Sequence, residues 1–199
     1  MAMDFKRVVK VINQRPVLNL PNKLTLIRIF LVPFLMVFLL ISNSRSFHYI
    51  AALIFITAII TDWLDGHIAR SMSQVTTLGK LLDPIADKLL ISSALISLVQ
   101  VGRVPAWMVV LLVGRDIAIT GLRAIAASQG LIIQASDLGK YKMIFEATAV
   151  VFLILDWSSP YQWLSFGPGI LLLWVAIGLA IISGVDYFIK FWGKINLEI

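Results

Sequence analysis

Long runs of apolar residues, separated by short polar breaks, dominate the pattern along the chain. Several runs reach the length of about 18 residues or more that an α-helix needs to cross a bilayer. No stretch shows the short apolar–polar alternation of a transmembrane β-barrel. The pattern therefore predicts an all-α membrane protein with six transmembrane helices. Their predicted limits are 23–41, 47–70, 77–100, 105–128, 139–157 and 168–192.

The segment before the first predicted span has a different pattern. Residues 2–15 mix apolar and basic side chains at helical spacing, which is typical of an amphipathic helix lying on the membrane surface. A solvated tail is the alternative. We expect the chain to divide into an amphipathic juxtamembrane segment at 1–16 and a single six-span domain at 17–199.

The distribution of lysine and arginine predicts the orientation of the spans. With the N-terminus in the cytoplasm, fourteen of these residues lie on the cytoplasmic side, and only Arg45 and Arg103 lie on the other side. Cytoplasmic loops of membrane proteins carry such an excess. The chain is therefore expected to have both termini in the cytoplasm (N-in, C-in).

The composition agrees with a membrane protein and excludes several other classes. Apolar residues make up 59% of the chain and charged residues only 14%, against about 25% charged in soluble domains. In a membrane protein, the net charge of +6 indicates contact with anionic lipid headgroups and not with nucleic acid. The absence of cysteine excludes disulfides and thiolate metal ligands.

Four aspartates interrupt the apolar pattern near the predicted cytoplasmic ends of the second and third spans. Asp62 and Asp65 are three residues apart, and Asp83 and Asp87 are four apart, so each pair shares one helix face. Carboxylates this close repel one another unless a cation lies between them. An oxygen-only donor set favours Mg²⁺ or Mn²⁺. Four carboxylates can hold two such divalent cations, an arrangement common in phosphoryl transfer.

The residues around the aspartates leave room for a phosphate-bearing ligand. Gly66, Ala69 and Gly79 keep the helix faces beside the aspartates open. Arg70 ends the second span with a planar fork suited to phosphate oxygens. Pro84 marks either the first turn of the third span or a kink within it.

Basic residues on the fourth and fifth predicted spans face the same cytoplasmic cavity. Only Asp116 and Asp137 are near them in sequence to neutralise their charge. A phosphate dianion suits such a site, whereas a neutral amino alcohol does not. These candidate acceptor-binding residues are Arg115, Arg123, Lys140 and Lys142.

The aspartate stretch resembles a known family signature. The pattern is Asp62-x-x-Asp65-Gly66-x-x-Ala69-Arg70, then eight residues, then Gly79-x-x-x-Asp83-x-x-x-Asp87. It is similar to the signature of the CDP-alcohol phosphotransferases. The resemblance implies that an acceptor hydroxyl attacks the β-phosphorus of a CDP-linked substrate at a di-metal site, and that CMP leaves.

The resemblance also implies a role for each matched residue. Asp62, Asp65 and Asp83 are expected to be metal ligands, and Asp87 is expected to be the general base and a further ligand. The residues expected to line the CDP site are Gly66, Ala69, Arg70 and Gly79.

Three further stretches, residues 20–34, 114–123 and 138–143, are similar to the bacterial phosphatidylglycerophosphate synthase branch of this family. This resemblance implies CDP-diacylglycerol and sn-glycerol 3-phosphate as substrates. It further implies a homodimer among the lipids of the bacterial cytoplasmic (inner) membrane, with its active site facing the cytoplasm.

Three residues at the start of the first span also match this branch. Asn22, Thr25 and Arg28 are candidates for contacts with the nucleotide or phosphate of the CDP-linked substrate. The alternative for Asn22 and Thr25 is helix capping. The alternative for Arg28 is interfacial snorkelling.

Two other functions are considered. The same chemistry could use inositol phosphate or phosphatidylglycerol as the acceptor. A divalent-cation transporter would also place aspartates within the membrane. The transporter hypothesis does not explain Arg70 or the basic cluster, which would repel a metal ion in transit. It also predicts metal flux without release of CMP.

Overall fold

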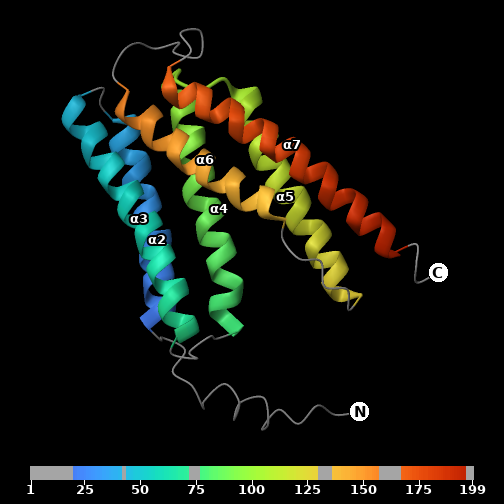
Figure 1. The fold of residues 1–199 in the computed structure, drawn as a ribbon. Helices are drawn as coiled ribbons and strands as arrows, with labels where there is room; N and C mark the ends of the chain where they lie inside the picture. Colours follow the sequence, from blue (N-terminus) through green and yellow to red (C-terminus); the bar gives the residue numbers. More distant parts are fainter. Residues whose placement is uncertain (1–19, 42–43, 72–76, 130–135, 157–166, 196–199) are drawn as a thin grey trace.

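The residues described in the computed structural model of the protein form six α-helices (Figure 1). The structure describes residues 20–41, 44–71, 77–129, 136–156 and 167–195, and the side chains of 22–41, 44–62, 82–129, 136–156 and 167–193. No strand occurs in these ranges, so the all-α class is confirmed. The helices are α2 (Leu20–Leu40), α3 (Arg45–Ser71), α4 (Thr77–Gln100), α5 (Ala106–Ser128), α6 (Asp137–Leu155) and α7 (Pro168–Ile195). The predicted surface helix at 2–15 and the predicted domain boundary after residue 16 lie outside the described residues.

The helix limits lie within three residues of the predicted ones because polar breaks fix the ends. Ser136 caps α6 by accepting a hydrogen bond from the backbone N–H of Gly139, at 3.4 Å. Pro105, in extended conformation, precedes α5. For Asn22 and Pro84, the structure decides between the alternatives that the sequence left open. Asn22 is the third residue of α2 and not its cap, and Pro84 lies inside α4 and not in its first turn.

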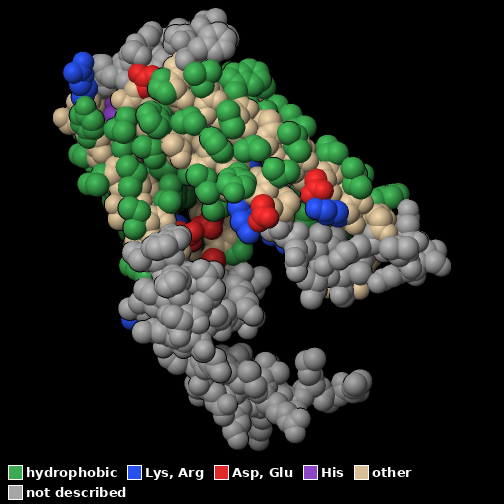
Figure 2. Space-filling model, viewed as in Figure 1, with side chains coloured by type: hydrophobic (Ala, Val, Ile, Leu, Met, Phe, Trp, Pro, Cys, Tyr) green, Lys and Arg blue, Asp and Glu red, His purple; other side chains and the backbone are tan. Residues whose placement is uncertain are grey.

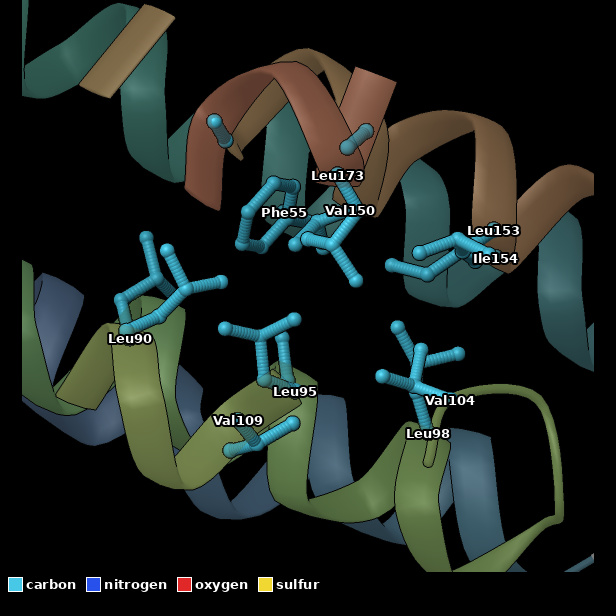
Figure 3. Close-up of a cluster of buried hydrophobic side chains, with 14 of the residues drawn as sticks. Phe55, Leu90, Leu95, Leu98, Val104, Val109, Val150, Leu153, Ile154 and Leu173 are labelled. Atoms are coloured by element: carbon cyan, nitrogen blue, oxygen red, sulfur yellow. The ribbon is translucent and has the colours of Figure 1, made fainter. Parts of the chain in front are cut away.

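The helices form two groups that meet in one core. Helix α2 packs against α3 and α4, and α7 packs against α5 and α6, while α6 also contacts α3 and α4. Figure 3 shows apolar side chains from several helices pointing toward one another, including Phe55 of α3, Leu95 of α4, Val150 of α6 and Leu173 of α7. Small buried residues, such as Ala58, let neighbouring backbones approach closely. Such packing drives helix association in a membrane.

Among the described residues, three helices are long and apolar enough to cross a membrane by length and composition. They are Asn22–Leu40, Arg45–Asp62 and Pro168–Gly193. The other three, α4, α5 and α6, each carry several charged residues, which belong to the candidate site. These findings indicate a membrane protein, and the number of six spans and the N-in, C-in orientation stay predictions.

At the end of the bundle where α4 meets α5, a buried arginine ties the turn to α6. Gly102 has a positive φ of 75°, which allows the tight turn. The Nη1 of Arg103 donates to the carbonyl oxygens of Leu153 at 2.7 Å and Ile154 at 3.0 Å. The Nη2 of Arg103 lies 3.4 Å from Nε2 of His48. Carbonyl groups in the last turn of α6, which have no partner within the helix, thereby receive donors.

Candidate active site

One face of α2 carries three buried polar side chains. Asn22, Thr25 and Arg28 follow one another at three-residue spacing, so they point to the same side of the helix. Their exposed fractions are 2%, 0% and 1%. This face is turned toward α3 and α4, the two helices that carry the aspartates. The burial of Arg28 shows that interfacial snorkelling, the alternative for this residue, is wrong.

The α2 residues bind aspartates from both neighbouring helices. The hydroxyl of Thr25 donates to Oδ1 of Asp83 at 2.7 Å, so helix capping is wrong for this residue too. The Nη1 of Arg28 lies 2.7 Å from Oδ1 of Asp62 and 3.0 Å from Oδ1 of Asp87. Its Nε donates to the carbonyl oxygen of Ala58 at 3.2 Å. The structure therefore brings three of the four predicted aspartates together around α2.

The aspartate side chains are open to one side. Those of Asp62 and Asp87 are 30% and 31% exposed, whereas the side chain of Arg28 is fully covered. Figure 2 shows acidic side chains lying in a hollow of the molecule, close to basic side chains. The two aspartates are therefore accessible to a ligand, whereas the Arg28 side chain that holds them is covered.

The donor set of this hollow fits a hard divalent cation. Asp62, Asp83 and Asp87 offer only carboxylate oxygens, the ligands that Mg²⁺ and Mn²⁺ prefer. In the arrangement that the structure shows, Arg28 supplies the compensating positive charge. Within the described side chains, no group of three acidic or histidine residues is placed so that it could hold a metal ion. Asp65, the fourth predicted ligand, is not among those side chains.

The predicted CDP-binding residues of α3 and α4 are placed only by their helices. Gly66, Ala69 and Arg70 lie in the last part of α3, and Gly79 lies in the first turn of α4. Their side-chain surroundings are outside the described residues, as are those of Asp65. Their roles stay predictions.

A second polar cluster joins α5 to α6 near the first. Asp116 accepts from two cations, with Oδ1 3.1 Å from Nη1 of Arg115 and Oδ2 2.7 Å from Nζ of Lys142. Lys142 also lies 2.7 Å from Oε2 of Glu146. The side chains of Lys142 and Glu146 are only 3% and 2% exposed. Breaking a buried ion pair is costly because it removes the compensation of a buried charge, although the pair as a whole is a weak source of stability.

Helix α7 fixes the direction of Arg115. The Nη2 of Arg115 donates to the hydroxyl of Ser183 at 2.7 Å, and its Nε donates to the carbonyl oxygen of Ala180 at 3.3 Å. With Asp116, these contacts engage all three nitrogens of the guanidinium. Arg115 and Lys142, two of the four predicted acceptor-binding cations, are therefore held together and oriented.

The other two predicted acceptor-binding cations have separate surroundings. Lys140 lies 2.8 Å from Asp137, and its side chain is 69% exposed. The guanidinium of Arg123 lies over the ring of Tyr187, 5.8 Å from its centre, where a cation–π interaction forms. Neither residue makes an ion pair with Asp116 in the part of the chain that the structure describes.

An apolar cavity of about 330 Å³ lies between α5 and α7. Arg115 is the only charged residue among its lining residues, which include Val110, Ala118 and Ile181. The cavity does not include the aspartates of α3 and α4. We therefore assign the candidate active site to the polar hollow and not to this cavity.

Two charged residues of the site were not among the predicted site residues. Glu146 follows Lys142 by one helical turn, so their spacing already allowed a pair. Lys88 follows Asp87 directly, and its Nζ donates to the hydroxyl of Thr120 on α5. Nothing in the spacing of Lys88 indicated that its side chain reaches the neighbouring helix.

Comparison with known proteins places the chain among transferases of phospholipid synthesis. A CDP-diacylglycerol–glycerol-3-phosphate 3-phosphatidyltransferase from Bacillus subtilis is 43% identical over 185 residues, covering 87% of this chain and 95% of the relative. A protein of the same name from Rickettsia felis is 39% identical over 171 residues, covering 85% of this chain and 93% of the relative. A probable phosphatidylglycerophosphate synthase from Mycobacterium tuberculosis is 41% identical over 174 residues, covering 85% of this chain and 79% of the relative.

The family resemblance of the aspartate signature is confirmed on a larger scale. The family model described as CDP-alcohol phosphatidyltransferase matches residues 18–182, a range that contains the clustered aspartates and the Arg115–Lys142 network. With most of its length matched and relatives at about 40% identity, this chain belongs to the CDP-alcohol phosphatidyltransferase family of membrane enzymes.

Proposed function

We propose that this protein transfers the phosphatidyl group of CDP-diacylglycerol to sn-glycerol 3-phosphate, giving phosphatidylglycerol phosphate and CMP. The names of the relatives from Bacillus subtilis and Rickettsia felis state this reaction for those proteins. The observation that carries the proposal here is the pairing of two clusters. Three aspartates of the family signature, Asp62, Asp83 and Asp87, converge on α2, and an oriented pair of cations, Arg115 and Lys142, lies on α5 and α6.

Members of this family are generally divalent-cation dependent. We propose that Asp62, Asp65, Asp83 and Asp87 hold two such ions, Mg²⁺ or Mn²⁺. When bound, these ions neutralise the diphosphate of the substrate and the charge that develops during transfer. The all-carboxylate donor set supports this assignment.

Asp87 is the proposed general base. Its side chain is 31% exposed, and its Oδ1 is held by Arg28. A carboxylate in this position can accept the proton of the acceptor hydroxyl if that hydroxyl comes within hydrogen-bond reach. The hydroxyl oxygen then bonds to the β-phosphorus, and the bond from that phosphorus to CMP breaks.

Arg115 and Lys142 are the proposed binding residues for the acceptor phosphate, with Arg123 and Lys140 contributing positive charge nearby. Asn22, Thr25 and Arg28, with Gly66, Ala69, Arg70 and Gly79, are the proposed surroundings of the CDP group. In the predicted orientation the hollow opens to the cytoplasm, where sn-glycerol 3-phosphate and the divalent cations are found. The acyl chains of the lipid substrate stay in the bilayer of the bacterial inner membrane. The proposed enzyme is a homodimer, which cross-linking in membranes can measure.

One assay tests the proposed reaction. Purified protein is mixed with Mg²⁺, CDP-diacylglycerol and labelled sn-glycerol 3-phosphate, and CMP and labelled lipid are measured. Both products are expected. Turnover with inositol phosphate or phosphatidylglycerol, and none with sn-glycerol 3-phosphate, would show that the acceptor is one of these two compounds. Metal flux through proteoliposomes without CMP release from any acceptor would favour the transporter hypothesis and refute the enzyme.

The variant Asp87→Asn tests the proposed base. We expect turnover to fall at least about a hundredfold, the lower range for loss of a general base, while CDP-diacylglycerol still binds. Asp186→Asn is the matched control, because Asp186 lies on α7 in an exposed pair with Lys190 at 2.7 Å. Turnover of Asp87→Asn close to that of the control would exclude Asp87 as the base.

A further inference from the structure

Lys88 is a half-buried cation inside the helix bundle that has no ion pair in the part of the chain that the structure describes. Its ammonium donates to the hydroxyl of Thr120 on α5. That hydroxyl in turn donates to the carbonyl oxygen of Asp116 at 2.6 Å. The bond to Thr120 uses one of the three N–H donors of an ammonium group.

The contrast with other cations of the site makes Lys88 unusual. Arg28 pairs with two carboxylates, Lys142 pairs with two, and Arg115 pairs with one. Lys88 is bound only to a neutral oxygen. A cation within a membrane protein is unfavourable unless it has a compensating charge or a functional ligand. The positive charge of Lys88 is therefore available for an anion.

The charged surroundings of Lys88 include both clusters of the site. Asp87 lies beside it in the chain, on the aspartate side. Asp116, Arg123 and Lys142 lie close enough on α5 and α6 to act on its ammonium electrostatically. Consecutive residues of an α-helix point about 100° apart. Asp87 can therefore face Arg28 on α2 while Lys88 reaches Thr120 on α5.

We infer that Lys88 binds the phosphate group of the acceptor and positions the acceptor hydroxyl at Asp87. This inference rests on the proposed function. A three-carbon acceptor has its hydroxyl and its phosphate at opposite ends, so the cation that holds the phosphate must lie within the length of the acceptor from the base. Lys88 follows Asp87 directly on α4, and its ammonium reaches Thr120 on α5, the helix that carries Arg115 and Asp116. Lys88 therefore links the helix of the base to the Arg115–Lys142 cluster.

The test compares Lys88→Met with Lys88→Arg and with the control Lys190→Met. Lys190 lies on α7, its side chain is 53% exposed, and its ion pair is with Asp186. The KM for sn-glycerol 3-phosphate, the KM for CDP-diacylglycerol, kcat and the thermal midpoint are measured for each. For Lys88→Met we expect the acceptor KM to rise about tenfold to a hundredfold, the size of a lost hydrogen bond to a charged group. The KM for CDP-diacylglycerol should change less than about twofold.

Lys88→Arg keeps the charge and should recover most of the acceptor affinity, and Lys190→Met should match the wild type. A purely structural role would lower the thermal midpoint or kcat and leave the acceptor KM unchanged, and this result would overturn the inference. An equal rise in both KM values would overturn it as well.

A second variant keeps the inference testable if Lys88→Met does not fold. Thr120→Val removes the hydroxyl that anchors Lys88 and keeps the charge. We expect it to raise the acceptor KM by about twofold to tenfold, as for loss of an ordinary hydrogen bond, and an unchanged KM would count against Lys88. Failure of the wild type to release CMP with sn-glycerol 3-phosphate would instead refute the proposed function. An active wild type with an unaltered acceptor KM in these variants would refute only the role of Lys88.

Discussion

Replacing Arg28 by methionine tests how the aspartate cluster is held together. The guanidinium of Arg28 is shared between Asp62 and Asp87 and also binds the carbonyl oxygen of Ala58. Methionine keeps an unbranched side chain but removes the charge and all five N–H donors of the guanidinium. Two carboxylates within about 3 Å of that charge then lose their compensating cation.

The contacts of Arg28 set the size of the effect. Removing one partner of a fully buried ion pair costs about 3–5 kcal/mol, and an exposed pair contributes only about 0–1 kcal/mol. The Arg28 side chain is fully covered, but the two carboxylates are 30% and 31% exposed. We therefore expect a loss of about 2–3 kcal/mol. For a chain of this size that corresponds to a fall of about 4–12 °C in the thermal midpoint.

The assay is thermal unfolding in detergent, first with a chelator and then with saturating Mg²⁺ or Mn²⁺. If the aspartates bind divalent cations, the added ion replaces the charge that the variant has lost. The rise in midpoint on adding the ion should then be larger in Arg28→Met than in the wild type. Arg103→Met is the matched control, because Arg103 is also a buried arginine but donates to carbonyl oxygens and not to carboxylates.

The control variant should be destabilised, yet its response to the ion should equal that of the wild type. Two results would refute the reasoning. One is an Arg28→Met midpoint within about 2 °C of the wild type in chelator, a shift of about 1 kcal/mol or less. The other is an ion-dependent rise that is no larger in Arg28→Met than in Arg103→Met.

Two further predictions concern the packing of α6. Glu146→Leu should destabilise the protein by about 1.5–3 kcal/mol, the size of a lost hydrogen bond to a charged group, because Lys142 loses one buried partner and keeps Asp116. Adding Lys142→Met should restore much of the thermal midpoint but not the acceptor KM, and a single variant as stable as the wild type would contradict this account. Gly169→Ala should cost about 1–3 kcal/mol, since the added methyl would lie 2.8 Å from Cγ and 3.1 Å from the backbone nitrogen of Leu153. Gly178→Ala has no atom within 4 Å of the added methyl and should leave the midpoint unchanged or raised; equal midpoints for the two alanine variants would show that the α6–α7 contact is not tight.

The sequence predicted the helices well because each is a local pattern. Apolar runs and polar breaks define α4 at 77–100, as the structure has it, and the other limits shift by no more than three residues. Helix capping was a wrong alternative for Asn22, and it arose because asparagine is a preferred capping residue. Helix α2 begins two residues earlier, and a capping type does not identify the true first turn.

The site was predicted in part, and the limit is contact between helices. The spacing of the aspartates placed each pair on one helix face, and Asp62, Asp83 and Asp87 do converge. The two partners of Arg28 could not be predicted. Asp62 lies 34 residues away on α3, and Asp87 lies 59 residues away on α4. The same holds for Lys142, whose partner Asp116 is 26 residues away. Helical spacing predicts neighbours within one helix and says nothing of which faces meet across two.

The hydrogen bonds of Arg103 constrain the order in which contacts can form while the chain is synthesised. Its partners, the carbonyl oxygens of Leu153 and Ile154, lie 50 and 51 residues further along the chain. When the ribosome has made α4, α5 and the turn between them, this guanidinium has not yet met the groups that hold it in the finished bundle. The turn between α4 and α5 therefore lacks these hydrogen bonds until α6 has been synthesised. Only then can Arg103 hold this turn against α6, at the end of the bundle opposite the aspartates.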